Sequence, residues 1–344
     1  MPPAAEGLAF WLPLTGAAVI ALAVVMYVIV DGFDLGVGIL FPFAREESWR
    51  DRMMLSVSPV WDGNETWLVL GGVGLFALFD VAYAIIMPAV YAPVLVMLIA
   101  LVFRGVSFEF RFKAERSRPL WDRSFFLGSL VATFAQGCVL GAFVQGFTTQ
   151  DQRFAGGPFD WLTPFSLLTG LGLVAGYALL GATWCVMKTT GELASWARRM
   201  ARRALPAVAL AMAAVSLWTP LLDAEIRTRW FSWPNLAWLA PVPLLTAAAF
   251  GLLWRALGQG GERAPFFLSI ALFLLGFVGL AASLFPMVVP PDLSIWDAAN
   301  TPKSQLFLLA GFAVAVPATF AYNAYSYWVF RGKVGEDAAE AYHL

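Results

Sequence analysis

Six ionisable side chains fall within or beside long apolar stretches in the first third of the chain. They are Asp31, Asp34, Asp62, Glu65, Arg104 and Glu109. Charged side chains at membrane depth are costly and usually mark a pathway or a site. Asp31 and Asp34 are three residues apart, as are Asp62 and Glu65, so each pair shares one helical face. Five carboxylates with one arginine predict a proton-conducting path that opens towards the cytoplasm.

A purely structural interpretation of these residues is also open. Arg104 would neutralise one or two acids and tie three helices together. This structural role explains one carboxylate paired with Arg104 more readily than it explains all five carboxylates. Two glycines on the first of these helices, Gly32 and Gly36, predict a face that packs closely on another helix. Val37 is expected to face outwards.

The composition is that of an integral membrane protein. The chain has 344 residues, of which 60% are hydrophobic and 13% charged, whereas soluble domains have about 45–50% apolar and about 25% charged residues. A spanning helix needs roughly 20 mostly apolar residues. The sequence therefore predicts an all-α, polytopic membrane protein with about nine transmembrane helices, at 8–41, 55–79, 82–110, 123–147, 162–187, 204–222, 235–256, 266–287 and 305–330.

Basic residues predict the orientation of these spans. Seventeen lie in or beside the loops 42–54, 111–122, 188–203 and 257–265 and the C-terminal tail, four lie on the other side, and Arg104 lies inside a span. Cytoplasmic loops carry the excess of Lys and Arg. We therefore expect the N-terminus outside and the C-terminus in the cytoplasm. The first segment lacks a basic start, so we expect it to be kept as a helix rather than cleaved as a signal peptide.

Several functions are disfavoured by what the sequence lacks. The only histidine is His343, in a polar tail, whereas haem in a membrane bundle is held by His or Met side chains. Cys138 and Cys185 stand alone in apolar runs, so we expect two small buried hydrophobic residues and no metal site. No glycine-rich nucleotide loop is present, and the net charge of −1 gives no indication of nucleic-acid binding.

A set of motifs gives the chain a family resemblance over essentially its whole length. The motifs are DGFDLGVG at 31–38, WDGN at 61–64, FRGVSFE at 103–109, GATW at 181–184 followed by KTTGEL at 188–193, and FPMVVP at 285–290 with WD at 296–297. In this order they resemble subunit II of the cytochrome bd-type quinol oxidases, including the cyanide-insensitive branch. Each motif alone is weak, but the ordered set is highly specific.

The resemblance implies a complex that couples quinol oxidation to the reduction of dioxygen to water. Subunit I would carry haem b and haem d. This chain, subunit II, would bind no haem and would support assembly, with a structural quinone in some members. Small single-helix accessory subunits are a further expectation. The resemblance also implies two four-helix bundles plus one peripheral helix within a single integral membrane domain, 1–344, with the acidic cluster in the first bundle, 1–150, and the second bundle and last helix in 151–344.

Four residues match the family's proposed proton-path positions: Asp31, Asp62, Arg104 and Glu109. Glu109 stands where aspartate is common, and Glu65 stands where glutamine occurs. The main alternative is a proton-coupled secondary transporter, although its sites are usually built from corresponding broken helices in two repeats. A scaffold subunit with vestigial acids is a second alternative.

Overall fold

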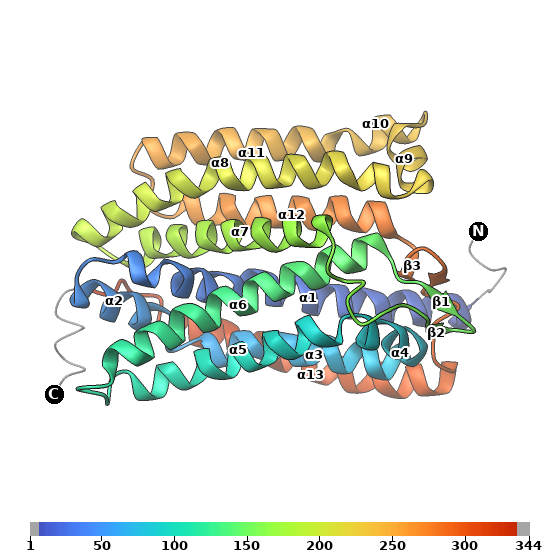
Figure 1. Ribbon diagram of the computed structural model, residues 1–344, viewed down its shortest axis with the longest axis horizontal. Helices are drawn as coiled ribbons and strands as arrows, with labels where there is room; N and C mark the ends of the chain where they lie inside the picture. The colour runs from blue at the N-terminus through green and yellow to red at the C-terminus, as the bar shows by residue number, and fades with distance from the viewer. Residues whose placement is uncertain (1–6, 336–344) are drawn as a thin grey trace.

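Long helices run side by side along the longest axis of the molecule (Figure 1). The computed structural model describes residues 7–335. The helices are α1 (Leu8–Leu40), η1 (Phe41–Phe43), α2 (Glu47–Val57), α3 (Trp61–Leu78), α4 (Asp80–Ala89), α5 (Tyr91–Phe110), α6 (Arg118–Gln145), α7 (Pro164–Lys188), α8 (Gly191–Leu222), α9 (Ala224–Phe231), α10 (Asn235–Leu239), α11 (Pro241–Gly258), α12 (Ala264–Leu284) and α13 (Pro302–Val329). Two small antiparallel hairpins join β1 (Thr149–Gln150) to β2 (Arg153–Phe154) and β3 (Met287–Val289) to β4 (Leu293–Ser294).

Eight helical segments within residues 7–335 are long and apolar enough to cross a membrane. They coincide with eight of the nine predicted spans, so the all-α, polytopic fold is confirmed and the count of nine is approximate. The remaining prediction, 55–79, falls mainly on α3. This helix is 18 residues long, but its first turns contain Asp62, Asn64 and Glu65, and it is not among the eight segments.

Two predicted spans contain breaks that have a local cause. The span at 55–79 begins in α2, and a turn at residues 58–60 separates α2 from α3. Proline has no N–H and clashes with the preceding helical turn, and Pro59 stands in this turn. The span at 82–110 divides at Val90 into α4 and α5. Pro93 follows in the first turn of α5, where it cannot donate a hydrogen bond to the carbonyl of Ala89.

The predicted loop 188–203 is wrong for most of its length. Helix α8 begins at Gly191 and continues to Leu222 without a break. Its first turns alternate buried residues, such as Leu193 and Trp196, with exposed arginines such as Arg199. The arginines therefore belong to an amphipathic helix end, which polarity alone cannot distinguish from a loop.

Helix α1 lies at the centre of the fold and packs against α3, α6 and α7. At its crossing with α7, a Cβ atom added to Gly36 would overlap the carbonyl oxygen of Tyr177, and one added to Gly32 would lie 2.7 Å from the Tyr177 ring. The predicted close packing of the Gly32 and Gly36 face is confirmed. Val37 is completely buried, so the expectation that it faces outwards is wrong. Because α1 is surrounded by helices here, it has no outward face at this level.

Polar contacts tie the end of the described chain to one end of the bundle. Lys188 Nζ donates to the carbonyl oxygens of Phe330 and Gly332, and Arg52 donates to that of Val334. At the opposite end Trp296 Nε1 donates to the carbonyl of Phe10, near the start of α1. The first and last described segments therefore lie at opposite ends of the bundle (Figure 1).

Candidate proton-transfer site between helices α1, α3 and α5

Arg104 of α5 joins two of the predicted carboxylates. Its Nη1 lies 2.6 Å from Asp31 Oδ1 on α1, and its Nη2 lies 2.8 Å from Glu65 Oε2 on α3. The side chains of Arg104 and Asp31 are fully buried, while that of Glu65 is 28% exposed. The guanidinium lies 5.8 Å from the Trp61 ring centroid. A planar guanidinium presents donors in a fixed fork, so one arginine holds acids from two helices at once.

Asp34 belongs to the same buried region but has a different partner. Asn64 Nδ2 donates to Asp34 Oδ2 at 2.7 Å and to the carbonyl of Val30 at 3.1 Å. Tyr327 on α13 donates its hydroxyl to Asn64 Oδ1 at 2.7 Å. Asp34 and Asn64 are both completely buried. Asn64 stands in the WDGN motif, but nothing in the sequence pairs it with Tyr327, more than 260 positions later.

Asp62 and Glu109 do not join the buried cluster. Both are exposed in the isolated chain. Glu109 forms an exposed ion pair with Lys113 one turn later, at 3.8 Å, and Asp62 forms no ion pair with a residue that the structure describes. The six predicted residues therefore divide into Arg104 with three carboxylates around it and two carboxylates that face outwards. Asp62 and Glu65 are three residues apart on α3, yet only Glu65 contacts Arg104.

Several buried polar atoms around the cluster lack a hydrogen-bond partner among the described residues. Within α1 they are the Tyr27 hydroxyl, Asp31 Oδ2 and Asp34 Oδ1; Arg104 Nε and Trp67 Nε1 are two more. Native proteins satisfy nearly all buried polar groups, with protein or with ordered water. The region is therefore polar enough to bind internal water next to the carboxylates.

A second ion network, which the sequence did not indicate, lies at the end of the bundle that carries α2. Arg111, fully buried at the end of α5, bonds Asp51 of α2 at 2.6 Å and Asp122 of α6 at 2.5 Å. Arg118 pairs with Asp51 at 3.1 Å and also with Glu47. These residues lie in three helices that are separate in sequence, so their spacing carries no signal. The network fastens α2 across the α5–α6 hairpin.

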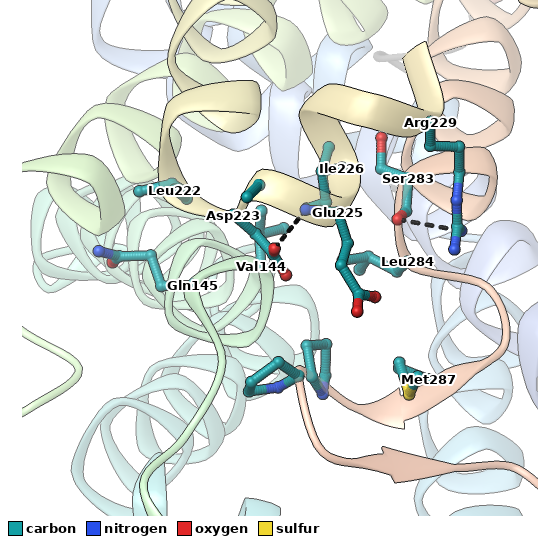
Figure 2. A pocket seen from close by; sticks show the side chains of 13 residues that line it. Val144, Gln145, Leu222, Asp223, Glu225, Ile226, Arg229, Ser283, Leu284 and Met287 are labelled. Carbon is teal, nitrogen blue, oxygen red and sulfur yellow. Dashed lines mark hydrogen bonds between the residues drawn. The ribbon is translucent and has the colours of Figure 1, made fainter. Parts of the chain in front are cut away.

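A cavity of about 270 Å³ lies at the other end of the bundle, away from the Arg104 cluster. It is lined by the last turn of α6, the α8–α9 junction and the segment from α12 to β3 (Figure 2). Arg229, at its edge, donates to the carbonyl oxygens of Ala282, Ser283 and Phe285 and so caps the end of α12. Asp223 accepts from the backbone N–H of Glu225. These charged groups mainly serve backbone capping.

Residues 7–335 contain no group of three or more His, Cys, Asp or Glu side chains that could hold a metal ion. His343 lies outside the described residues. The two cysteines are buried and unbridged, as expected. Asp80, in the first turn of α4, is exposed and accepts from the backbone N–H of Val81.

Comparisons with known proteins identify the family of the chain. Residues 12–330 match the family described as cytochrome bd terminal oxidase subunit II. The chain is 29% identical to cytochrome bd-I ubiquinol oxidase subunit 2 of Escherichia coli (strain K12), with 96% of each chain covered. It is 28% identical to cytochrome bd ubiquinol oxidase subunit 2 of Bacillus subtilis, with 94% of this chain and 97% of the relative covered.

The fold is also that of a solved oxidase chain. A chain in the structure of the bd oxidase from Geobacillus thermodenitrificans superposes with a TM-score of 0.73 and 20% identity, covering 93% of this chain and 98% of that one. The family match spans nearly all of the described helices, including those that carry the Arg104 cluster. The chain therefore belongs to the cytochrome bd terminal oxidase subunit II family.

Proposed function

We propose that this subunit of a terminal oxidase complex binds no haem, stabilises subunit I and provides a proton path that opens to the cytoplasm. The observation that carries the proposal is the arrangement around Arg104. Asp31 and Glu65 contact its guanidinium, and Asp34 lies buried beside them. Reduction of dioxygen consumes protons, and a buried line of carboxylates beside polar atoms that have no described partner can supply them. Family membership favours this function over a secondary transporter.

The two exposed acids would form the outer part of the path. Glu109 lies in the last turn of α5 and Asp62 in the first turn of α3, and both helix ends lie close together because Trp61 stacks on Phe108. Glu109 would take up protons, Asp62 would relay them, and Asp34, Glu65 and Asp31 would carry them inwards. Arg104 would orient the carboxylates and the water between them.

The same exposed acids support a role in assembly. An ionised carboxylate that faces lipid at membrane depth is costly, so the α3–α5 face with Asp62 is best covered by protein. Apolar side chains of the same helices are also exposed, among them Val69 and Phe76 of α3 and Val102 of α5. We infer that this face contacts subunit I. Small accessory subunits would dock elsewhere.

Haem b and haem d would be bound by subunit I. Histidine is absent from residues 7–335, so the described bundle offers no imidazole ligand to haem iron. When bound in subunit I, the haems supply the electrons that reduce dioxygen. The complex would exchange electrons with the membrane quinol pool, and a structural quinone on this chain belongs to the same proposal.

The proposed location is the bacterial cytoplasmic membrane, with the N-terminus outside and the C-terminus inside. Contacts at the α2 end of the bundle bring together Arg52, Lys188 and Lys333, which the sequence assigns to the cytoplasm. Arg229 lies at the other end, near β3. Both groups fit the positive-inside rule.

The decisive variant is Asp31→Asn in the assembled complex. It removes the titratable carboxyl group but keeps size and hydrogen bonding. We expect haem content near normal and oxygen consumption with excess quinol, normalised to haem, reduced by about tenfold or more. The matched control is Asp80→Asn, because Asp80 is an exposed acid in α4. Full turnover of Asp31→Asn would exclude the path, whereas loss of haem would support a scaffold.

Haem absorbance on the isolated chain would exclude the haem-free role.

A further inference from the structure

The orientation of the Asn64 side-chain amide is fixed by its surroundings. Its Nδ2 faces the carbonyl oxygen of Val30, which only accepts, and its Oδ1 receives the hydroxyl of Tyr327. The second Nδ2 proton is therefore directed to Asp34 Oδ2. Asn64 uses both donors and an acceptor site in this arrangement, whereas an inverted amide would place its oxygen against the carbonyl oxygen of Val30, which cannot donate.

This orientation distinguishes the two oxygens of Asp34. Oδ2 is the acceptor of a hydrogen bond, while Oδ1 is buried without a partner among the described residues. In a protonated carboxyl group the carbonyl oxygen is the better hydrogen-bond acceptor, so the proton belongs on the oxygen that does not accept from Asn64. In Asp34 that oxygen is Oδ1.

The charge balance around Asp34 decides whether a proton is present. The charged groups that face it are Asp31, Glu65 and Arg104. The only cation among them already contacts the other two acids directly, so an ionised Asp34 would leave the group with two net negative charges. Burial of an uncompensated carboxylate is far more costly than its protonation.

We propose that Asp34 holds a proton on Oδ1 in the resting oxidase, and that Asn64 and Tyr327 are the positioning residues that assign the proton to this oxygen. The proposal rests on the proton path described above and identifies the residue of that path that holds a proton at rest. It gives α13, the last of the described helices, a direct part in that path. Asp31, held by Arg104, is the ionised neighbour.

The transfer step that follows moves one proton from Asp34 to Asp31. The O–H bond of Asp34 Oδ1 breaks, the proton passes through water to Asp31 Oδ2, which is also buried without a described partner, and Asp34 becomes an anion. Its only described hydrogen-bond donor is then the neutral amide of Asn64. Reprotonation from the cytoplasmic side restores the resting state, because Asp34 lies about one turn closer to that side than Asp31.

Infrared difference spectroscopy of the assembled oxidase tests the proposal. At neutral pH the wild-type complex should show a C=O stretching band of a protonated carboxyl group that shifts in D₂O and is missing in Asp34→Asn. Tyr327→Phe removes only the hydroxyl that holds Asn64 Oδ1. It should shift the frequency of this band and reduce turnover about threefold to tenfold, with haem content unchanged. The control is Tyr325→Phe, an exposed tyrosine on the same helix, which should match wild type.

Two results would overturn the proposal: no carboxyl band lost in Asp34→Asn, or a band that Tyr327→Phe leaves at the wild-type frequency. These results are independent of the Asp31→Asn test. A slow Asp31→Asn oxidase with no Asp34 band would retain the path and exclude the stored proton. A fully active Asp31→Asn oxidase with the Asp34 band present would exclude the path and retain the protonated Asp34.

Discussion

Gly36 of α1 and Gly181 of α7 lie backbone to backbone at the centre of the bundle. A Cβ atom added to Gly36 would lie 2.8 Å from the amide nitrogen of Gly181, and one added to Gly181 would overlap the carbonyl carbon of Gly36. Neither neighbour is a flexible side chain that could move away. Asp31 and Asp34 lie on α1 a few residues before this crossing, so the crossing helps to position them.

Gly36→Leu should therefore prevent stable assembly of the oxidase. Overpacking alone costs about 1–3 kcal/mol, and here the clash is with backbone, so α1 and α7 must separate. The measurement is the yield of haem-bearing complex from solubilised membranes. Gly251→Leu is the matched control, because Gly251 of α11 has nothing within 4 Å of an added Cβ. Equal yields from the two variants would show that the crossing tolerates separation.

Arg104→Met should destabilise the complex more than Asp31→Asn does. It leaves Asp31 without its cation in a fully buried site, and removing one partner of a buried ion pair costs about 3–5 kcal/mol. The measurement is the temperature at which haem absorbance is lost in detergent. Combining Arg104→Met with Asp31→Asn and Glu65→Gln removes the uncompensated charges and should restore part of the loss. No difference between the single and triple variants would contradict a charge effect.

The sequence predicted the spans well because length and hydropathy are local properties. Eight of them, and the close packing at Gly36, follow from runs of apolar residues and from glycine spacing. Helix phase could not be predicted in the same way. A helix that is apolar all round has no polar stripe to show which face is buried, and so Val37 was placed outwards although it has no exposed surface.

The candidate site was predicted in part for a similar reason. The pairing of Arg104 with acids of two other helices follows from the rarity of charge in spans. The exposure of Asp62 and Glu109 depends on the rotation of α3 and α5 about their axes, which the sequence of these helices does not reveal. The contacts of Tyr327 with Asn64, and of Arg111 with Asp51 and Asp122, join helices distant in sequence. Neither has a spacing that a single sequence can display.

Arg111→Met should destabilise the contacts of α2 with α5 and α6 without affecting proton transfer. Arg111 is buried between α2, α5 and α6, and its loss leaves Asp51 and Asp122 with fewer donors. We expect earlier thermal loss of the complex, with turnover per haem near normal in the molecules that remain assembled. Arg116→Met is the control, because Arg116 is exposed in the same connection. Turnover per haem that falls as sharply as in Asp31→Asn would place Arg111 in the path instead.

Asp62→Asn and Glu109→Gln should have different effects on turnover, because Asp62 is proposed to relay protons and Glu109 to take them up from bulk water. Both side chains are exposed in the isolated chain, so neither substitution disturbs the core, and haem content should stay near normal. Asp62 leads from the surface to the Arg104 cluster through its neighbour Glu65 on α3, and its loss should reduce turnover strongly, by about tenfold or more. Glu109, next to bulk water and to Lys113, can be replaced by water, and its loss should reduce turnover only mildly. The measurement is oxygen consumption with excess quinol, normalised to haem.

Full turnover of Asp62→Asn would show that protons reach the cluster by another route, and loss of haem would show that Asp62 serves the contact with subunit I.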